Sequence, residues 1–372
     1  MNFNCEKSVL LNGILTASRT VAAKSTIPAL EGLLIETEND MLVLTGYNLK
    51  TGIRTKVPAD IKEDGKIIIN ARLLSEIVRK MSEGTINISA DNGFLVKISC
   101  SASYFEIMGS SAENFPELPS VDAMNSVSVP EGKLKEMIAQ TLFAVSTNET
   151  RPVHTGSLFE VENGVLTVVS VDGFRLALRR EKISDENVSE NSFVVPGAAL
   201  SEVEKIASDG EETVTISLGS RHIMFSIGDT EVISRRLEGE FLDYRKSIPA
   251  AGKYTIGADR KLLIDVFERV SLVINEKYKS PERCCFGNKI LKVSSSTALG
   301  KATDECGVDG DGEGLEIGFN NRYMLDALRA VPSDEINIQI SSGISPCVIV
   351  PSDGSDRFVY LVLPVRIKSE DA

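Results

Sequence analysis

Several hallmarks of catalytic sites are missing from this sequence. No Gly-Lys pair is followed by Ser or Thr, so the chain has no phosphate-cradling P-loop. Its only histidines, His154 and His222, lie far apart and lack a partner at metal-ligand spacing. We therefore expect no catalytic residue, no bound metal and no cofactor.

Disulfide, membrane and secretion signals are missing as well. The six cysteines show no CxxC spacing, which predicts reduced thiols in the cytoplasm and neither a zinc site nor a disulfide framework. Because adjacent cysteines rarely close a disulfide, we expect Cys284 and Cys285 to be buried thiols. No run approaches the roughly 20 apolar residues of a membrane span. The N-terminal segment offers no small-residue cleavage site, so a secretory signal is not expected.

Basic residues are in the minority. The chain of 372 residues has 40 Lys and Arg against 53 Asp and Glu, which gives a net charge of −13. This balance argues against a protein that wraps nucleic acid over its general surface. Any contact with DNA must be confined to a local basic patch. The acidic, glycine-rich stretch from Asp304 to Glu313 suggests calcium, but the glycine at position six and the flanking helices of an EF-hand are missing, so we predict a solvated loop.

The stretch from Phe143 to Arg180 has the clearest local pattern. Two short β-rich runs, 158–161 and 166–169, flank Asn163-Gly164. This dipeptide predicts a tight hairpin turn, because both residues tolerate positive φ angles. The next break, at Asp172-Gly173, predicts a bulge or corner where a surface groove can open.

Self-similarity along the chain predicts three copies of one module. A shift of 124 residues lays Pro28 on Pro152, and a shift of 126 lays Phe115 on Phe241. A third, fainter copy repeats the two helices at 261–263 and 323–328. Boundaries are expected near 123–126 and 250–253, which gives the domains 1–124, 125–251 and 252–372.

Each copy predicts a strand, an amphipathic helix, several strands, a second helix and further strands. Two apolar stripes of the first copy are expected to be core, namely Val9, Leu10, Ile14 and Leu15, then Leu73, Leu74, Ile77, Val78 and Met81. The runs 66–70, 85–89 and 95–99 alternate with the period of half-buried strands. The fold class is therefore α+β, with two helices per copy packed on one face of antiparallel sheets.

Basic residues recur on the polar sides of these helices. They are Lys7, Arg19, Lys24, Arg72, Arg79, Lys80, Lys133, Lys135, Lys205, Arg260, Lys261, Arg269, Arg322 and Arg329. One reading is a solvated helix face, since Lys and Arg are good helix formers and acids such as Glu76 and Glu202 share these helices. The other reading is one common surface that faces a polyanion. Threefold repetition favours the second reading, because symmetric copies place equivalent residues on one side of the assembly.

The chain resembles the bacterial replicative sliding clamp, the β subunit of DNA polymerase III, over its full length. The segments that carry the resemblance are FAVSTNETRP, VDGFRLALRR, EGEFLDYRKSIP, INEKYK, IGFNNRYMLDAL and LVLPVRI. The resemblance implies a head-to-tail homodimer of three-domain DNA-clamp protomers, a six-domain ring that encircles double-stranded DNA with its helices inside. Phosphate contacts carry no sequence information, so such a ring slides while topology retains it. The resemblance thus implies a non-enzymatic processivity factor that tethers the polymerase.

The resemblance also carries over the expected contacts with DNA and between protomers. The residues matching its DNA contacts are Lys24, Arg72, Arg79, Asn148, Lys277, Tyr278 and Lys279. For the homodimer, Phe105 and Ile107 of one first domain are expected to meet Leu272 and Val273 of the other third domain. Pairing across that contact would hide exposed strand edges.

A partner groove is implied between the second and third domains. By resemblance, it is expected to take short apolar peptides from the DNA polymerase III catalytic subunit, the clamp loader, other polymerases and repair proteins. The matching residues are His154, Val171, Gly173, Phe174, Arg175, Leu176, Leu242, Lys246, Ser247, Leu361, Leu363, Pro364, Val365 and Arg366. An apolar pocket rimmed by Arg175 and Arg366 suits a peptide anchor.

The chain departs from the family pattern at three groove positions and at its end. Phe174 replaces a histidine, Leu242 a proline and His154 an apolar residue, which bears on peptide preference. The extra residues 368–372 form a tail that could partly mask the groove. Plain core packing is the alternative for Leu176, Leu361 and Leu363. For the whole chain the alternatives are a soluble repeat scaffold that binds only proteins and, more remotely, a calcium-dependent hydrolase.

Overall fold

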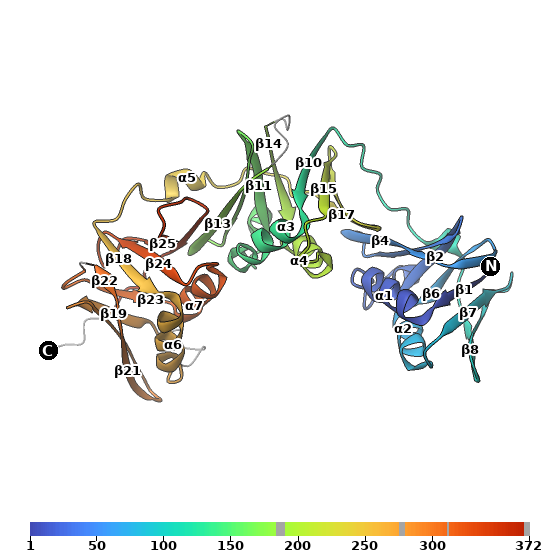
Figure 1. The fold of residues 1–372 in the computed structure, drawn as a ribbon, viewed down its shortest axis with the longest axis horizontal. Coiled ribbons are helices and arrows are strands. Elements are labelled where there is room, and N and C mark those ends of the chain that lie inside the picture. The colour runs from blue at the N-terminus through green and yellow to red at the C-terminus, as the bar shows by residue number, and fades with distance from the viewer. Residues whose placement is uncertain (184–189, 275–279, 311, 368–372) are drawn as a thin grey trace. The chain divides into compact units, whose positions relative to one another are not determined.

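The computed structural model describes residues 1–183, 190–274, 280–310 and 312–367. The predicted order of elements recurs three times along the chain (Figure 1). The first copy contains β1 (Asn2–Glu6), α1 (Lys7–Ser18), β2 (Gly32–Glu38), β3 (Met41–Tyr47), β4 (Thr51–Pro58), β5 (Asp60–Glu63), β6 (Lys66–Asn70), α2 (Ala71–Lys80), β7 (Thr85–Ala90), β8 (Leu95–Cys100) and β9 (Ser103–Met108).

The second and third copies repeat this order. The second contains β10 (Asn125–Pro130), α3 (Glu131–Ala139), β11 (Gly156–Glu162), β12 (Val165–Val171), β13 (Arg175–Lys182), β14 (Asn191–Pro196), α4 (Gly197–Ile206), β15 (Thr213–Leu218), β16 (His222–Ile227) and β17 (Thr230–Arg235). The short helix α5 (Tyr244–Ser247) follows. The third contains β18 (Tyr254–Asp259), α6 (Arg260–Ser271), β19 (Glu282–Gly287), β20 (Ile290–Thr297), β21 (Gly300–Gly307), β22 (Asp309–Gly310), β23 (Glu316–Phe319), α7 (Asn321–Ala330), β24 (Glu335–Ile340), β25 (Cys347–Pro351) and β26 (Phe358–Val362).

Three of the helices begin with the same local chemistry. The side chains of Asn70, Asp259 and Asn320 each accept a hydrogen bond from the backbone N–H three residues further on. Such a cap satisfies one of the amides that a helix start leaves without an internal partner. Asn70 and Asn320 cap the second helix of the first and third copies, and Asp259 caps the first helix of the third copy. The sequence therefore marks these three strand-to-helix transitions locally.

The apolar stripes are confirmed for most of their members. Leu10 and Ile14 of α1 and Leu74 of α2 are fully buried in the first core. Leu15 and Leu73 were expected in the core and are 39% and 42% exposed, so this part of the prediction is wrong. Each follows or precedes a buried leucine or isoleucine by one position, which turns its side chain about 100° away around the helix.

The predicted hairpin and corner are both present in the second copy. Asn163 and Gly164 have φ angles of 52° and 70° and join β11 to β12. At the corner before β13, Gly173 has a φ of 91°, and Asp172 Oδ1 accepts hydrogen bonds from the N–H groups of Phe174 and Arg175.

Three expectations about charged residues are wrong. The stretch from Asp304 is not a loop, because 300–307 forms β21 and 309–310 forms β22. Asp304 accepts a hydrogen bond from Arg269 of α6, and this contact accounts for an acid on a strand. Lys7 is buried against Glu83, at 2.7 Å, and Lys24 lies beyond the end of α1, so neither is on an exposed helix face.

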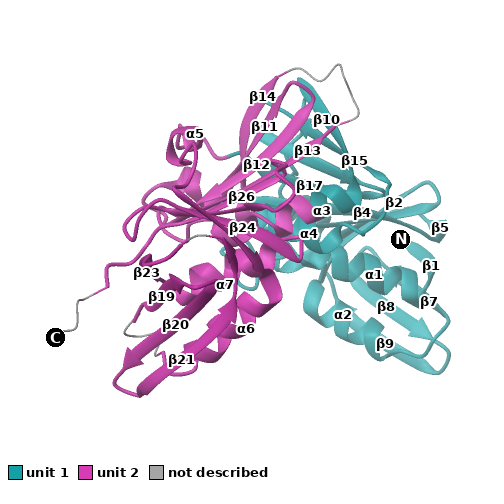
Figure 2. Cartoon of the chain, turned by 60° about the vertical axis from the view of Figure 1, so that its left-hand side comes forward, with its two compact units in different colours: residues 1–135, 198–236 teal, residues 136–197, 237–372 magenta. Residues whose placement is uncertain are grey.

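Strand pairing continues from one copy to the next. β4 pairs with β17 inside an eight-stranded sheet, and β13 pairs with β26 inside a nine-stranded sheet. The chain accordingly forms two compact units, 1–135 with 198–236 and 136–197 with 237–372 (Figure 2). The elements of the second copy are thus divided between the two units, and its sheets are completed by strands of the neighbouring copies.

Two smaller sheets complete the fold and have exposed edges. The five-stranded sheet has the order β5-β1-β7-β8-β9, and the four-stranded sheet the order β21-β20-β19-β23. Among the described helices, none is long and apolar enough to cross a membrane. Among the same residues, no three His, Cys, Asp or Glu side chains lie where they could hold a metal ion. Cys284 is buried as expected, while Cys285 is half-buried.

Candidate partner groove and nucleic-acid interface

An apolar row crosses the β13–β26 pairing and forms the floor of the candidate groove. Val171 lies opposite Leu176, Leu176 opposite Leu361, and Leu361 opposite Val348 on adjacent strands. These four residues belong to one buried cluster that also contains Val153. Since partners on neighbouring strands point to the same face of a sheet, the row presents a continuous apolar surface. The expected residues Val171, Leu176 and Leu361 are therefore brought together.

One wall of the groove is the connection that carries α5. The hydroxyl of Tyr244 donates to Glu160 Oε2 at 2.5 Å, and Arg245 forms ion pairs with Glu160 and Glu162 at 3.2 and 3.0 Å. Burial and the bond to Glu160 raise the pKa of Tyr244. The buried tyrosine fixes α5 against β11, and with it the expected groove residues Leu242, Lys246 and Ser247.

A cavity of about 470 Å³ opens between this connection and the turn that precedes β11. It is lined by Arg151, Pro152, Val153, His154, Glu238, Gly239, Glu240, Phe241, Leu242 and Asp243. The ring of His154 packs edge-on against Phe241, with centroids 5.3 Å apart. Burial, with a smaller effect of Arg151, lowers the pKa of His154. A neutral imidazole beside a phenyl ring makes this cavity suited to apolar side chains.

Arg175 was expected to rim the groove, and its guanidinium group is occupied within the chain. It binds Asp172 at 3.0 Å and Asp326 at 2.6 Å, and it donates to the carbonyl of Phe143 at 2.6 Å. It also lies 4.5 Å from the ring centroid of Tyr323 on α7. At 8% exposure, Arg175 is a buried bridge between β13 and α7. Arg175 therefore contributes to the groove by holding β13 and α7 together, and its charge is already paired within the chain.

The C-terminal segment after β26 forms the opposite wall. Leu363 N–H donates to the carbonyl of Phe174 at 2.8 Å, and Val365 N–H donates to the carbonyl of Gly318 at 2.8 Å. Phe174 is 59% exposed and stacks on Tyr323. Leu363 is 37% exposed, so the core-packing alternative applies to the buried Leu176 and Leu361 and not to Leu363.

The remaining expected groove residues are surface residues. Gly173, Lys246 and Arg366 are exposed, while Ser247 and Pro364 are half-buried. Lys246 pairs with Asp243 at 2.8 Å. The tail 368–372 lies outside the described residues, and so does its expected relation to the groove.

Sequence reasoning missed several residues that shape the groove. Val153, Phe241, Tyr244 and Val348 all belong to the buried cluster or pack against it. The shift of 126 residues offered a signal for Phe241, because it lays Phe115, a buried residue, on that position. Nothing in the local sequence distinguishes Val348 from an ordinary strand residue.

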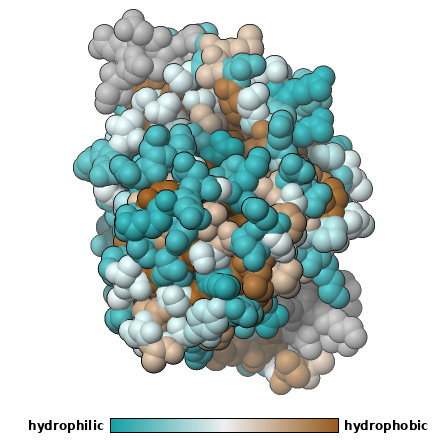
Figure 3. Space-filling view, turned by 90° about the vertical axis from the view of Figure 1, so that its right-hand side faces the viewer, coloured by the Kyte–Doolittle hydropathy of each residue, from teal (hydrophilic) through white to brown (hydrophobic). Residues whose placement is uncertain are grey.

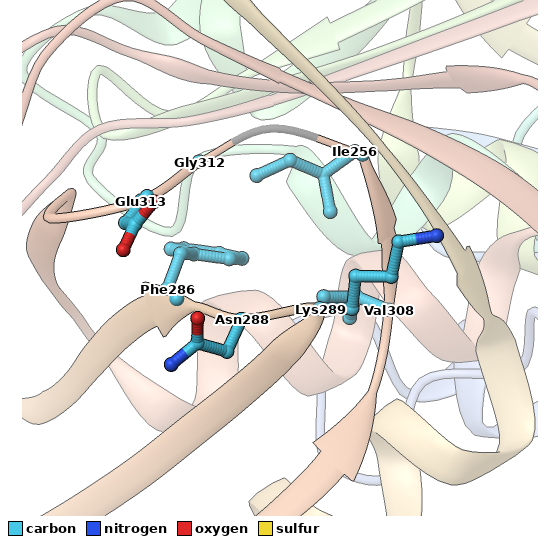
Figure 4. A pocket seen from close by; sticks show the side chains of 9 residues that line it. Ile256, Phe286, Asn288, Lys289, Val308, Gly312 and Glu313 are labelled. Atoms are coloured by element: carbon cyan, nitrogen blue, oxygen red, sulfur yellow. The ribbon is translucent and has the colours of Figure 1, made fainter.

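A second cavity lies elsewhere in the third copy, and its lining contains none of the expected groove, DNA-contact or protomer-contact residues. Its volume is about 190 Å³, and its lining includes Ile256, Phe286, Lys289 and Val308 (Figure 4). The side chains of Ile256 and Phe286 face one another across it (Figure 4). Lys289 pairs with Asp309 at the rim, at 3.4 Å. This cavity is therefore a small hollow of mixed polarity beside the β19–β20 turn, since Asn288 and Glu313 also line it.

The expected DNA contacts are exposed where the structure describes them. Lys24, Arg79 and Asn148 are exposed, and Arg72 is exposed while pairing with Glu76 at 3.1 Å. Lys277, Tyr278 and Lys279 lie outside the described residues. Several other helix cations have acidic partners, among them Lys135 with Asp209 and Arg329 with Glu268. Part of the basic set is therefore neutralised locally, as a solvated helix face would be.

Two of the expected protomer contacts lie on an edge strand, and the other two follow helix α6. Phe105 is 38% exposed on β9, the last strand of the five-stranded sheet, whereas Ile107 packs partly into the first core. Leu272, just after α6, is 81% exposed, and Val273 is half-buried. On the side of the molecule that carries the N-terminus, small apolar patches interrupt a mostly hydrophilic surface (Figure 3).

Comparison with known proteins places the whole chain in one family. Models of the N-terminal, central and C-terminal domains of the DNA polymerase III beta subunit match residues 1–119, 128–243 and 245–366. The beta sliding clamp of Halalkalibacterium halodurans is 32% identical over 379 residues, covering 98% of this chain and 100% of the relative.

Solved structures agree with that placement. The DNA polymerase sliding clamp of Bacillus subtilis superposes with a TM-score of 0.94 at 31% identity, covering 99% of this chain and 100% of that chain. The Pseudomonas aeruginosa sliding clamp, solved bound to griselimycin, has a TM-score of 0.94 at 28% identity and covers the same shares. The chain belongs to the DNA polymerase III beta subunit family, the sliding clamps of bacterial replication.

Proposed function

We propose that two copies of this chain close into a ring that encircles double-stranded DNA and tethers the replicative polymerase. The single observation that carries this proposal is the repeated strand pairing between copies of the module. β17 pairs with β4, and β26 pairs with β13 in the same way. In the first copy, β9 is equivalent to β17 and β26. In the third copy, β21 is equivalent to β4 and β13. Both β9 and β21 are edge strands, so the same pairing between two molecules would close the ring.

The two internal pairings predict the register of the pairing between molecules. Val232 lies opposite Ile53, and Tyr360 lies opposite Ala177. The starts of the helices align the three copies, and the strand pairings then give the equivalent residues on each strand. In this alignment Phe105 corresponds to Val232 and Tyr360, and Ala302 corresponds to Ile53 and Ala177. Phe105 should thus face Ala302 of the second copy, and both internal junctions give this same register.

The next pair in this register has complementary charges. It places Glu106 opposite Lys301, at the positions that Ile233 and Gly52 hold in the first junction. Opposite charges directly across two strands stabilise the pairing, and like charges destabilise it. Glu106 also accepts a hydrogen bond from the Tyr104 hydroxyl at 2.6 Å, which holds its carboxylate on the strand.

The proposed DNA contacts follow from charge and exposure. Arg72 and Arg79 lie on α2, and Lys24 lies in the segment after α1, all exposed. In a chain with a net charge of −13, such local cations would hold the phosphate backbone loosely while the acidic remainder repels stray DNA. Loose, sequence-independent contacts permit sliding, and closure of the ring prevents escape.

The groove is the proposed docking site for partner peptides. The apolar row from Val171 to Leu361 and the cavity beside His154 offer burial for apolar side chains of a short peptide. Partners of this class are the polymerase catalytic subunit, the clamp loader and repair proteins. The chain then acts as a non-catalytic subunit, and we place it in the cytoplasm with the chromosome.

A loading experiment separates the clamp from a scaffold that binds only proteins. The chain is loaded by a clamp-loader complex onto nicked circular plasmid and passed through a gel-filtration column at increasing salt. We expect retention on the circle at salt concentrations that abolish simple phosphate contacts, and loss of the protein once the plasmid is linearised. Equal behaviour on circular and linear DNA, or no retention on either, would contradict the ring.

Charge exchange tests the register between the two copies. Glu106→Lys alone and Lys301→Glu alone each place like charges opposite one another. We expect the dissociation constant of the dimer to rise at least tenfold in each single variant. The double variant restores opposite charges and should recover the dimer, as measured by analytical ultracentrifugation. Failure of the double variant to recover would argue against this register.

A further inference from the structure

Two backbone hydrogen bonds attach the C-terminal wall of the groove to the rest of the chain. Between β26 and the end of the described chain, Leu363 is tied to Phe174 and Val365 is tied to Gly318, each by one hydrogen bond of 2.8 Å. The first bond reaches the corner before β13. The second reaches β23, which is the edge strand of the four-stranded sheet. The wall therefore depends on how closely the segment 363–367 approaches β23.

Gly318 is the residue that permits this close approach. A Cβ atom at this position would lie 2.6 Å from the carbonyl oxygen of Val365 and 2.7 Å from Cγ1 of Ile367. Both distances are shorter than a carbon atom tolerates, and the first involves backbone, which cannot rotate away. The φ angle of Gly318 is not in the left-handed region. Space, and not backbone conformation, is thus what requires glycine here.

The approach also covers an exposed strand edge. The inner side of β23 pairs with β19, where Gly318 lies opposite Arg283. On its outer side, the Gly318 carbonyl accepts the Val365 N–H, and Gly343 of the β24–β25 loop approaches the carbonyl of Glu316. Covering an edge strand with a short segment is a common protection against wrong pairing. Here the covering segment is also the groove wall.

We propose that Gly318 is a positioning residue of the partner groove, which acts by letting the C-terminal segment lie against β23 and so fixing Leu363 to Arg366. The proposal rests on the proposed function of the groove as a peptide site. Gly318 itself touches no partner. It lies on β23, two residues before the Asn320 cap of α7, and α7 carries the Tyr323 and Asp326 that hold Arg175. The C-terminal segment and Arg175 are therefore both held by residues at the β23–α7 corner.

The test compares two Gly→Ala variants in the same sheet. In Gly318→Ala the new methyl group meets Val365 and Ile367, whereas in Gly287→Ala it meets nothing within 4 Å and the φ angle is again outside the left-handed region. The probe is a fluorescein-labelled hexapeptide with one aspartate and a terminal Leu-Phe, titrated by fluorescence anisotropy on the full chain. We expect Gly318→Ala to weaken binding about tenfold and Gly287→Ala to leave it unchanged.

A second readout distinguishes positioning from a general loss of stability. Amide hydrogen exchange of the segment 363–367 should become faster in Gly318→Ala, while exchange in β25 and β20 stays as in the unaltered chain. If the peptide binds both Gly→Ala variants equally well, or if exchange in 363–367 does not change, the proposal is overturned. If the unaltered chain does not bind the peptide, the peptide-docking function fails instead, and the exchange measurement still decides whether Gly318 positions the segment.

A milder variant covers the case in which Gly318→Ala does not fold. Ile367 is half-buried at the end of the described chain, and its side chain lies over Gly318. Ile367→Ala removes the side chain that packs over Gly318 without adding any atom. We expect two- to threefold weaker peptide binding and faster exchange at 363–365. Unchanged values for both would count against the positioning role.

Discussion

The two internal junctions are built by the same strand pairing, yet the connections that follow them pack differently. At the first junction, Gly52 lies opposite Ile233. A Cβ atom on Gly52 would lie 2.8 Å from Cδ2 of Leu118, so the connection after β9 fills that space. Phe115 from the same connection is 7% exposed and buried beside Tyr47. The apolar surface of this junction is closed by the chain itself.

At the second junction the corresponding connection stays at the side of the apolar row. Leu176 lies opposite Leu361, and Phe241 and Leu242 line a cavity of about 470 Å³. Phe241 occupies the place of Phe115 in the repeat, but it packs against the half-buried His154. The difference teaches that the connection, and not the sheet, decides which junction offers a binding site.

The largest expected contrast comes from truncating the two equivalent phenylalanines. Phe115→Ala removes a buried ring from a closed cluster, so the free energy of unfolding should fall by about 3–4 kcal/mol with peptide affinity unchanged. Phe241→Ala should lower it by only about 1–2 kcal/mol, because that ring is partly solvated, while peptide binding weakens at least tenfold. Urea denaturation and anisotropy titration measure the two effects. Equal stability losses with equal affinities would remove the distinction.

Replacing Arg175 tests how much the second junction depends on its buried ion pairs. Arg175→Met leaves Asp172 and Asp326 without their main partner, and we expect a loss of roughly 3 kcal/mol in the free energy of unfolding. The equivalent position in the first junction is Thr51, where Thr51→Ala should cost about 1 kcal/mol. A loss for Arg175→Met no greater than that for Thr51→Ala would show that the bridge is not structural.

The third copy differs from the first by a buried acid, and this predicts a pH dependence. Glu282 is equivalent to the buried Leu33, because each lies opposite the strand residue that precedes a helix cap, Phe319 and Ile69. Burial raises the pKa of Glu282 to about 8, and Asn321 donates a hydrogen bond to it at 3.0 Å. Because the folded pKa lies above the unfolded value of 4.5, the unfolded state loses its proton first as pH rises.

The sign of the effect follows directly. The contribution of Glu282 to the free energy of unfolding is fully present below about pH 4.5. It falls as pH rises towards 8, by up to about 1.4 kcal/mol per pH unit. Glu282→Gln should remove this slope in urea denaturation curves taken between these values, whereas Glu305→Gln on the exposed side of β21 should keep it. An unchanged slope in Glu282→Gln would locate the pH dependence elsewhere.

The smallest effect is expected at the rim of the groove. Lys246 is 85% exposed and pairs with Asp243, so Lys246→Ala should alter the free energy of unfolding by less than about 0.5 kcal/mol. The association rate of an acidic peptide should fall about two- to threefold at low salt and recover its normal value at high salt, as stopped-flow fluorescence would measure. A decrease that persists at high salt would indicate that Lys246 acts through packing.

Local chemistry made much of the fold predictable. The Asn163-Gly164 turn and the strand 66–70 depend on neighbours in sequence, and repetition extended the order of elements to the other copies. The acidic stretch at β21 was misread because its acid is matched by Arg269, which lies far away in the sequence. Lys7 was misread for the same reason, since Glu83 neutralises it. Whether a charged residue is buried or exposed depends on partners that are distant in the sequence, and a single sequence does not reveal those partners.

The candidate groove was predictable in part. Val171, Leu176 and Leu361 were expected, and the structure gathers them in one cluster. The role of Arg175 was not predictable, because its partners Asp326 and Phe143 belong to different segments of the chain. Gly318 gave no signal, since a glycine required for space looks the same as any other glycine in a strand.

The continuity of the β13–β26 pairing has a practical consequence for dissecting the protein. A fragment that ends near residue 244 would leave the backbone amides of β13 without their partner strand, and a fragment that starts there would bare β26 in the same manner. Naked strands of this kind recruit one another at high concentration. Separately produced pieces should precipitate when alone and remain clear when refolded together, so the family domains, although distinct in sequence, behave as inseparable parts of one polymer.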